Sequence, residues 1–428
     1  MNAVGIDVSK EKSTVVILRP FGEVVAAPYD VSHTDSELDR LAKVIKKLPG
    51  ETRVVMEATG VYYEPVARRL HEHGIFVSVV NPVLISDYPG GVIDVGSEIS
   101  VVNPVLISDY GDNTLRKAKT DRKDAIKIAS YALSAWLDLV EYKPEEDRRR
   151  TLKSLNRQVK KVIKVNTMLK NNLISLTDTA FPGINKLFTS QERPSDGHLK
   201  WVDFVAKFSH RDTVAKLSLN AFKKKYKSWC EKNKYHYQDS KAEEIHAHAR
   251  KCVAGVSAEE TFCLMVTKAA EFVNAACENE NALKNEMDRL SSTLPEYEVV
   301  MGMYGVGKST GPQLMAEIGD TRRFRNRRAI TAFFGYDTEP DDSGQHISKS
   351  RPITKKGSPS LRRTLFIIMK TLVTKKPVDN PVYAFLDKKR SEGKHYYSYM
   401  TAASAKFLRI YYAKVNEVLN KKETSMCT

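Results

Sequence analysis

Four carboxylates stand at positions where they could bind divalent metal ions. Asp7 lies in the apolar run AVGIDV, and Glu57 lies in a second apolar run, TRVVMEAT. Burying an ionised acid in such a strand is unfavourable unless a positive charge compensates it, and Mg2+ prefers carboxylate oxygens. Asp121 and Asp124 follow in the helical pattern KTDRKDAIKIASYAL, where a spacing of three residues puts both on one helix face. Singly, each acid is explained more simply as a strand-end or helix-capping residue, but together they predict a magnesium site.

Residues 1–144 have the pattern of an α/β domain that would position these acids. Three strand runs come first (AVGID, STVVILRP and EVVAAPYDV), and the helical segment SELDRLAKVIKKLPG follows them. The strand TRVVMEAT, the helical segment VYYEPVARRLHEHG and the strand IFVSVVNP continue the alternation. This order is typical of the RNase H-like, RuvC-like fold, in which the first and fourth strands are neighbours. Asp7 is therefore expected to lie beside Glu57.

An internal duplication interrupts this domain. SVVNPVLISDY occupies residues 78–88 and recurs unchanged at 100–110, an offset of 22 residues. Two copies are too few for a solenoid, which needs at least about three units. We expect one copy of this 78–110 duplication to form the strand, and the other to be accommodated as a surface loop or an extra edge strand.

Residues 145–295 are predicted to be mainly helical. Apolar residues recur every three or four positions over 152–176, interrupted by the polar Asn166, and a second seam of this kind covers 262–294. The two seams could join separate chains as a coiled coil or pack against each other within one chain, and the spacing alone does not distinguish these arrangements.

A basic and aromatic insertion at about 183–258 separates the two seams. Lysines alternate there with Phe222, Tyr226, Trp229, Tyr235 and Tyr237. This composition suits phosphate neutralisation with base stacking, and it equally suits a solvated helical insertion.

The C-terminal part, residues 296–428, opens with a glycine-rich turn. GMYGVGKS at 302–309 fits the P-loop pattern by letter, but no acidic strand end that could bind magnesium follows it. We favour a helix-hairpin-helix, in which the turn with Gly305, Gly307 and Lys308 offers backbone N–H groups and a cation to a DNA phosphate.

A dense basic block follows this turn and predicts contact with several phosphates. Its candidate nucleic-acid-binding residues are Arg322, Arg325, Arg327, Arg328, Lys355, Lys356, Arg362 and Arg363. Ser343 lies within this block, in the turn-prone sequence DDSGQ. A serine hydroxyl is a weak nucleophile until it is activated, so the residues alone favour a simple turn at Ser343.

The composition favours a nucleic-acid partner and argues against a membrane protein. The chain has 428 residues and a net charge of +16, which predict a polyanionic partner. No stretch approaches the roughly 20 apolar residues of a membrane span, and the N-terminus lacks a secretory pattern. The five cysteines form no CxxC pair, which favours a reducing cytoplasm and argues against a ribbon-type zinc site.

Six motifs, in this order along the chain, resemble the DEDD transposases of the bacterial insertion-sequence one-ten family. They are GIDVSK, MEATG, KTDRKDA, GVGKSTGPQLMAEIGD, the SG of DDSGQ, and ITKKGSPSLRR. The resemblance implies a RuvC-like N-terminal domain, a central coiled coil and a C-terminal transposase domain. It further implies that Asp7, Glu57, Asp121 and Asp124 bind magnesium and that Ser343 joins covalently to DNA.

The same resemblance implies the partners. A structured bridge RNA would pair with donor and target DNA, and the recombinase would act as a homo-oligomer, a dimer or tetramer, at the bacterial nucleoid. A RuvC-like nuclease or junction resolvase that uses activated water is the alternative. Two departures from the family pattern are the duplication, which falls between Glu57 and Asp121, and the long insertion at 183–258.

Overall fold

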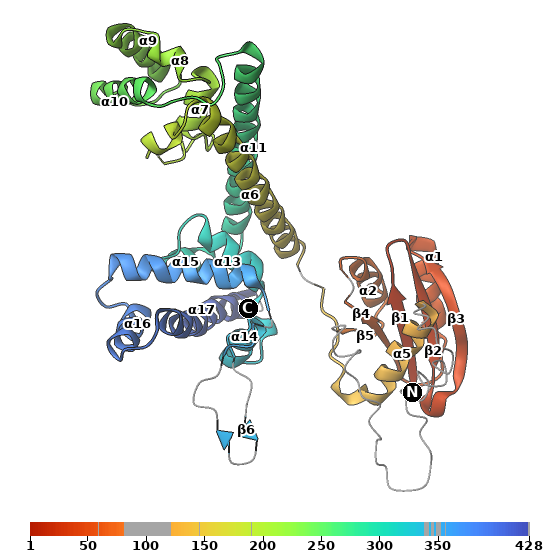
Figure 1. Cartoon of the computed structure of the whole chain (residues 1–428). Helices are drawn as coiled ribbons and strands as arrows, with labels where there is room; N and C mark the ends of the chain where they lie inside the picture. The colour runs from red at the N-terminus through yellow and green to blue at the C-terminus, as the bar shows by residue number, and fades with distance from the viewer. Residues whose placement is uncertain are drawn as a thin grey trace. The chain divides into compact units, whose positions relative to one another are not determined.

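The computed structural model divides into two compact units, Met1–Glu145 and Glu146–Thr428 (Figure 1). It describes residues 1–58, 60–80, 121–144, 146–189, 191–337, 342–343, 346–347, 352–355 and 357–426. The second copy of the duplication and all but the first three residues of the first copy lie outside these ranges. Their accommodation as a loop or an edge strand therefore stays a prediction.

A five-stranded mixed sheet forms the centre of the first unit. The strands are β1 (Asn2–Val8), β2 (Lys12–Leu18), β3 (Val24–Ser32), β4 (Thr52–Glu57) and β5 (Val77–Val80). They lie in the order β3-β2-β1-β4-β5. The first three strands pair antiparallel, whereas β1 pairs with β4 and β4 with β5 in parallel. The predicted neighbours, the first and fourth strands, are confirmed.

Helices cover both faces of this sheet. Helices α1 (Asp35–Lys46) and α2 (Tyr63–Glu72) share a buried apolar cluster with one face, and α5 (Asp121–Ser134) packs on the other. Gly5 of β1 permits the close approach of α5. A Cβ at Gly5 would lie only 2.3 Å from the carbonyl oxygen of Ala125. Helix α5 therefore rests directly on the backbone of the central strand.

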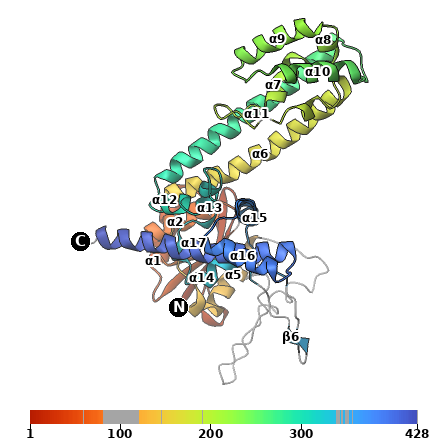
Figure 2. The ribbon, with the colours of Figure 1, turned by 90° about the vertical axis from the view of Figure 1, so that its left-hand side faces the viewer.

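Two long helices, α6 (Asp147–Ala180) and α11 (Glu260–Ser292), pack side by side within the second unit (Figure 2). They carry the two apolar seams, so the seams pair inside one chain. Asn166, the polar residue of the first seam, binds a residue of the second seam. Its Nδ2 donates to Glu280 Oε2 at 2.8 Å, and both side chains are buried. The intramolecular alternative therefore accounts for both seams.

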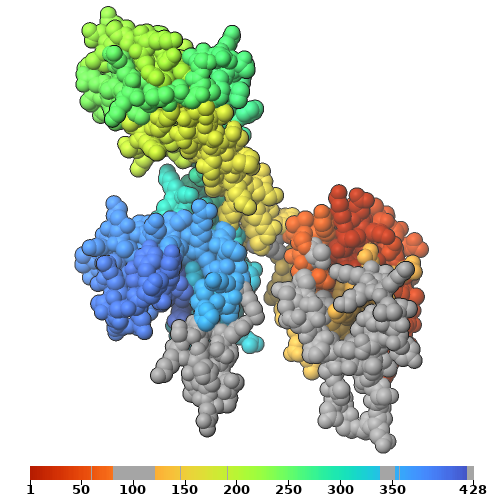
Figure 3. Space-filling model, viewed as in Figure 1, coloured from red at the N-terminus to blue at the C-terminus, as the bar shows by residue number. Residues whose placement is uncertain are grey.

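The insertion forms a helical lobe (Figure 3). Its apolar core also includes Leu173 of α6 and Val273 of α11. Its elements are η3 (Ile184–Leu187), α7 (Lys200–Lys207), α8 (Asp212–Ala215), α9 (Leu219–Lys232) and α10 (Asp239–Lys251). The rings of Phe222, Tyr226 and Trp229 are buried, and Tyr226 stacks on each of the other two at a centroid distance of 5.7 Å. Base stacking by these three rings is therefore wrong as a hypothesis, since they form the core.

The remaining helices of the second unit enclose a further apolar cluster. They are α12 (Tyr297–Met301), α13 (Thr310–Ile318), α14 (Arg327–Phe333), α15 (Pro359–Lys375), α16 (Pro381–Ser391) and α17 (Tyr396–Met426), with the short helix η4 (Thr321–Arg323) and the hairpin β6 (Asp342–Ser343) and β7 (His346–Ile347). Leu152 of α6 and Met287 of α11 belong to the same cluster as Leu365 and Phe407.

No helix in the described ranges is long and apolar enough to cross a membrane.

A buried ion pair ties α6 to the start of α12. The Arg149 guanidinium donates to both carboxylate oxygens of Glu296, with Nη2 and Oε2 3.0 Å apart. The exposed fractions of these side chains are 4% and 0%. Removing one partner would leave the other charge buried without compensation.

We therefore expect Arg149→Ala to lower the free energy of unfolding by about 3–5 kcal/mol. Denaturant unfolding followed by circular dichroism measures this loss. Arg289→Ala is the matched control, because it breaks an exposed pair with Glu286 and should cost less than about 1 kcal/mol. Equal losses in the two variants would contradict a structural role for the buried pair.

Candidate active site

Asp7 and Glu57 lie next to each other at the carboxyl ends of two parallel strands. The parallel pairing of β1 and β4 runs up to Ile6 opposite Met56, and the two acids are the next residues on their strands. Both acids are half-buried. The sheet therefore places two carboxylates at one edge, as the strand order predicts.

Helix α5 covers the face of the sheet on which Asp7 lies. Side chains alternate along a strand, so Ala3, Gly5 and Asp7 share this face. Ala3, near the start of β1, belongs to the same apolar cluster as Ala132, near the end of α5. Gly5, further along β1, lies against Ala125, near the start of α5. Helix α5 therefore runs antiparallel to β1, and its first turn lies toward Asp7.

Asp121 and Asp124 occupy this first turn. Asp121 precedes Ala125 by about one helical turn, roughly 5.4 Å, and Asp7 lies two residues beyond Gly5, roughly 6.6 Å along the strand. Asp124 is half-buried and Asp121 is exposed. The four acids are thus brought to the same end of the sheet, on the same face.

The donor set at this end of the sheet fits a divalent cation. All four side chains offer hard carboxylate oxygens, the ligands that a divalent cation such as Mg2+ prefers. Within the residues that the structure describes, no group of three or more His, Cys, Asp or Glu side chains is close enough to hold a metal. The backbone therefore positions the acids, but the side chains do not form a closed metal site.

Two further polar residues lie beside Asp7 across the sheet, and the sequence patterns did not predict them. Thr14 of β2 lies opposite Asp7, and Asp30 of β3 lies opposite Thr14. Thr14 Oγ1 donates to Asp30 at 2.9 Å, and Lys12 forms an ion pair with Asp30 at 2.6 Å. The hydrogen bond from Lys12 to Asp30 raises the pKa of Lys12, and the charge of Asp121 adds to this effect. The sequence signal that could have identified these residues is strand alternation, which places Lys12 and Thr14 on the same face of the sheet as Asp7.

Ser343 lies in the second unit. It ends the two-residue strand β6, and its backbone pairs with His346 of β7. Its side chain is not among the described parts of the structure. The role of Ser343 as a nucleophile therefore stays a prediction.

The glycine-rich turn lies between two helices, α12 and α13. A P-loop connects a strand to a helix, so the P-loop alternative is wrong for this segment. Gly305 has a positive φ of 86°, and a Cβ there would lie 3.1 Å from Ile368 of α15. Gly307 has open space around it, and Lys308 is exposed. Gly305 thus faces the protein, whereas Gly307 and Lys308 face solvent.

The predicted phosphate-binding residues differ in their surroundings. Arg322 forms an ion pair with Asp320 at 2.6 Å. Arg362 donates to the carbonyl oxygen of Phe334 at 3.1 Å, so Arg362 makes a structural contact. The exposed members are Arg322, Arg325, Arg327, Arg328, Lys355 and Arg363. Lys356 lies outside the described residues.

A basic groove between α14, α16 and α17 was also missed. Its volume is about 500 Å3, and its lining includes Arg327, Lys406, Arg409 and Lys414 but no acidic residue. Lys406 Nζ lies 4.7 Å from the ring centroid of Phe385. The cations of α17 recur at helical spacing among apolar residues, so they do not form a visible block in the sequence.

We expect Arg409→Gln combined with Lys414→Gln to weaken DNA binding and to reduce its salt dependence. Each lost phosphate contact lowers the slope of log affinity against log salt by about 0.9, so the slope should fall by about 2. Lys370→Gln with Lys375→Gln is the matched control, because both lysines are exposed on α15 outside the groove. An equal change in both pairs would show that only net charge matters. Fluorescence anisotropy with labelled duplex DNA measures these slopes.

Family models match both ends of the chain. Residues 4–98 and 90–182 match the model of DEDD transposases of the IS110 type, and residues 297–384 match the transposase IS116/IS110/IS902 family. The chain belongs to the insertion-sequence one-ten, or IS110, family of DEDD transposases. This IS110-family transposase therefore belongs to a class of enzymes that cut and rejoin DNA.

The DEDD transposase model matches two stretches of the chain, and each stretch contains one copy of the duplication. The stretch 4–98 contains the first copy of SVVNPVLISDY, and the stretch 90–182 contains the second. Each copy thus lies in a family-like context, which agrees with a local duplication in this IS110-family transposase.

Solved structures of RuvC are similar to one third of the transposase. The Thermus thermophilus RuvC in complex with Holliday junction substrate is 15% identical, with a TM-score of 0.23 over 33% of this chain and 98% of that chain. A second T. thermophilus RuvC structure is 16% identical, with a TM-score of 0.23 over 33% of this chain and 99% of that chain. No curated protein matches the chain.

Proposed function

We propose that this transposase recombines DNA with two sets of residues, one from each unit. Asp7, Glu57, Asp121 and Asp124 bind magnesium, and Ser343 is the nucleophile that forms a covalent link to DNA. The observation that carries the proposal is the convergence of the four acids at the carboxyl ends of β1 and β4. Such a set of hard carboxylate oxygens is the donor type that divalent cations prefer.

The four acids and Ser343 have different roles in the proposed reaction. A divalent cation held by the four acids would supply positive charge to the phosphate that is cut. The Ser343 hydroxyl attacks phosphorus, its proton passes to a base or to solvent, and the bond from phosphorus to the leaving deoxyribose oxygen breaks. The resulting phosphoserine diester conserves the energy of the broken bond. A free DNA hydroxyl then reverses the exchange and restores Ser343, so rejoining needs no ATP.

The DNA backbone contacts belong to the C-terminal helices. The solvent-facing Lys308 and the exposed arginines of α14 suit phosphate binding, because their cations neutralise phosphates, whereas the backbone N–H of Gly307 already donates to Thr310 Oγ1 at 2.9 Å. The family resemblance adds a structured guide RNA that pairs with donor and target DNA. It also adds a homo-oligomer, in which the acids and Ser343 could come from different copies of the chain.

One experiment tests the proposal as a whole. The protein is purified from cells that carry its insertion sequence, its bound RNA is sequenced, and strand exchange is assayed with DNA that matches this RNA. We expect recombined product and a protein–DNA adduct that mass spectrometry maps to Ser343. Cleavage without any adduct would instead support hydrolysis by activated water, the reaction of a nuclease or resolvase.

A further inference from the structure

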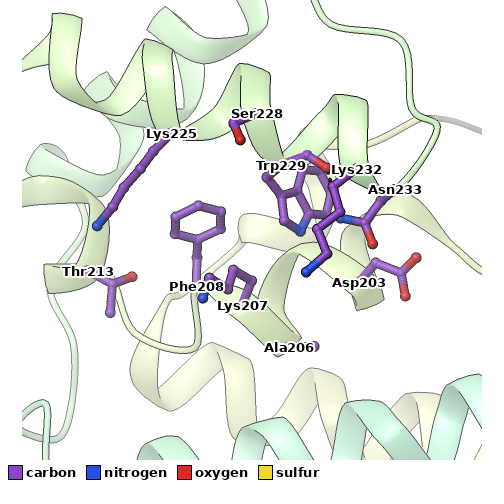
Figure 4. A pocket seen from close by; sticks show the side chains of 10 residues that line it. All are labelled: Asp203, Ala206, Lys207, Phe208, Thr213, Lys225, Ser228, Trp229, Lys232 and Asn233. Carbon is purple, nitrogen blue, oxygen red and sulfur yellow. Dashed lines mark hydrogen bonds between the residues drawn. The ribbon is translucent and has the colours of Figure 1, made fainter.

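The insertion contains a pocket that the proposed reaction does not use. It lies among α7, α8 and α9, has a volume of about 650 Å3, and includes three lysines in its lining: Lys207, Lys225 and Lys232. Figure 4 shows Lys225 and Lys232 extending from α9 toward the segment that carries Lys207 and Phe208. Helical spacing explains this arrangement, because residues 225, 228, 229 and 232 share one face of α9.

The three lysines are free to bind an anion. All three are exposed, and none forms an ion pair with another residue of the described chain. Lys223 of the same helix, by contrast, is bound to Glu243 at 2.6 Å. The insertion as a whole has 15 Lys and Arg against 8 Asp and Glu, a net charge of +7. Both the pocket and its surroundings therefore attract negative charge.

One acid, Asp203, also lines the pocket, but its carboxylate is already bound. Tyr235 donates to Oδ2 at 2.6 Å, Asn274 donates to Oδ1 at 2.7 Å, and Arg193 lies 3.6 Å away. Burial and the bond to Asp203 raise the pKa of Tyr235, which keeps its hydroxyl neutral and donating. The charge of Asp203 is thus compensated from within the lobe.

Part of the pocket wall is apolar and aromatic. Phe208 and Trp229 are only 4% and 9% exposed, so the rings form a wall rather than a protruding platform. The faces of Trp229 are covered by Tyr226 and Tyr235, so a ligand contacts the ring edge and does not stack on it. A ligand that satisfies both parts of the pocket carries a phosphate for the lysines and an apolar part for this wall. A pocket of this volume is within the range that holds small organic ligands, about 300–1,000 Å3, and a nucleotide has this chemistry.

The shape of the site favours a strand with unpaired bases. Duplex bases are stacked inside the helix, so a duplex can place only its phosphates at the mouth of a pocket. A single strand can insert one nucleotide and leave its neighbouring phosphates on the lysines around the mouth. We propose that the pocket of the insertion binds one nucleotide of a single-stranded nucleic acid, with Lys207, Lys225 and Lys232 on the phosphates. This inference goes beyond the proposed recombination, because it concerns equilibrium binding and needs no cleavage.

The test compares two triple variants of the full chain. Lys207→Gln, Lys225→Gln and Lys232→Gln remove the pocket charges. Lys224→Gln, Lys227→Gln and Lys251→Gln remove the same charge from exposed positions of the insertion outside the pocket. Anisotropy is measured with labelled oligouridylate, oligothymidylate and duplex DNA over a range of salt. Neither variant should lose thermal stability, because all six side chains are exposed.

We expect the pocket variant to bind single strands about tenfold more weakly than the control variant at physiological salt. Its slope of log affinity against log salt should fall by about 2, since each single-strand phosphate contact contributes about 0.7. A loss shared by both strands identifies any single strand as the ligand, and a loss confined to RNA identifies a contact with the 2′-hydroxyl. Equal losses in the two variants, or an equal loss for the duplex, would overturn the proposal.

Discussion

Asp7→Asn should reduce DNA cleavage by about 10³-fold or more, a loss of about 4 kcal/mol in transition-state stabilisation. The amide keeps the size of the side chain but removes the negative charge that binds a metal ion. Asp7 lies between Glu57 on β4 and Thr14 on β2, so no other acid of the sheet can take its position. A strand-cleavage assay with magnesium measures the loss.

The fold should survive this change. Removing one of several neighbouring negative charges relieves repulsion, so the free energy of unfolding should stay constant or rise. Asp138→Asn is the matched control, because it neutralises an exposed acid in the same unit. An Asp7→Asn protein that recombines DNA at the parental rate would refute the four-acid site.

Ser343→Ala should abolish the covalent adduct and reduce strand transfer by about 10³-fold or more, as expected when a nucleophile is removed. DNA binding should persist, because the basic groove and the exposed arginines are unchanged. Denaturing gels show the adduct, and mass spectrometry locates it. Ser391→Ala, at an exposed serine of α16, is the control and should leave the adduct intact.

Two results would contradict the serine mechanism. One is an adduct at a residue other than Ser343, and the other is full strand transfer without an adduct. A mixture of the Asp7→Asn and Ser343→Ala proteins adds a test of assembly. If one copy supplies the acids and another supplies the serine, the mixture should regain activity that neither protein has alone.

Local sequence patterns were sufficient for the central sheet. The apolar runs around Asp7 and Glu57 and the order of strands and helices predicted that β1 and β4 are neighbours, and the pairing confirms it. Strands depend on short-range alternation and on the order of elements, which a sequence displays directly. The family also followed from the sequence, since its motifs are local.

Contacts between distant segments were decided only by the tertiary structure. Thr14 and Asp30 join the row of Asp7 through pairing registers, and a register depends on turns and bulges that composition does not reveal. The heptad seams fitted two arrangements equally, and the hydrogen bond between Asn166 and Glu280 belongs to the arrangement within one chain.

Burial separates the lysines of the insertion from its aromatic rings. In the sequence they alternate, and both kinds of residue suited nucleic-acid contact. Helix α9 turns Phe222, Tyr226 and most of Trp229 into the core and leaves Lys225 and Lys232 exposed at the pocket. The sequence by itself determined which residue types are present and their periodicity. Only the packing of α9 against α7 and α10 decided which of them meet solvent, because burial depends on neighbours that are far away along the chain.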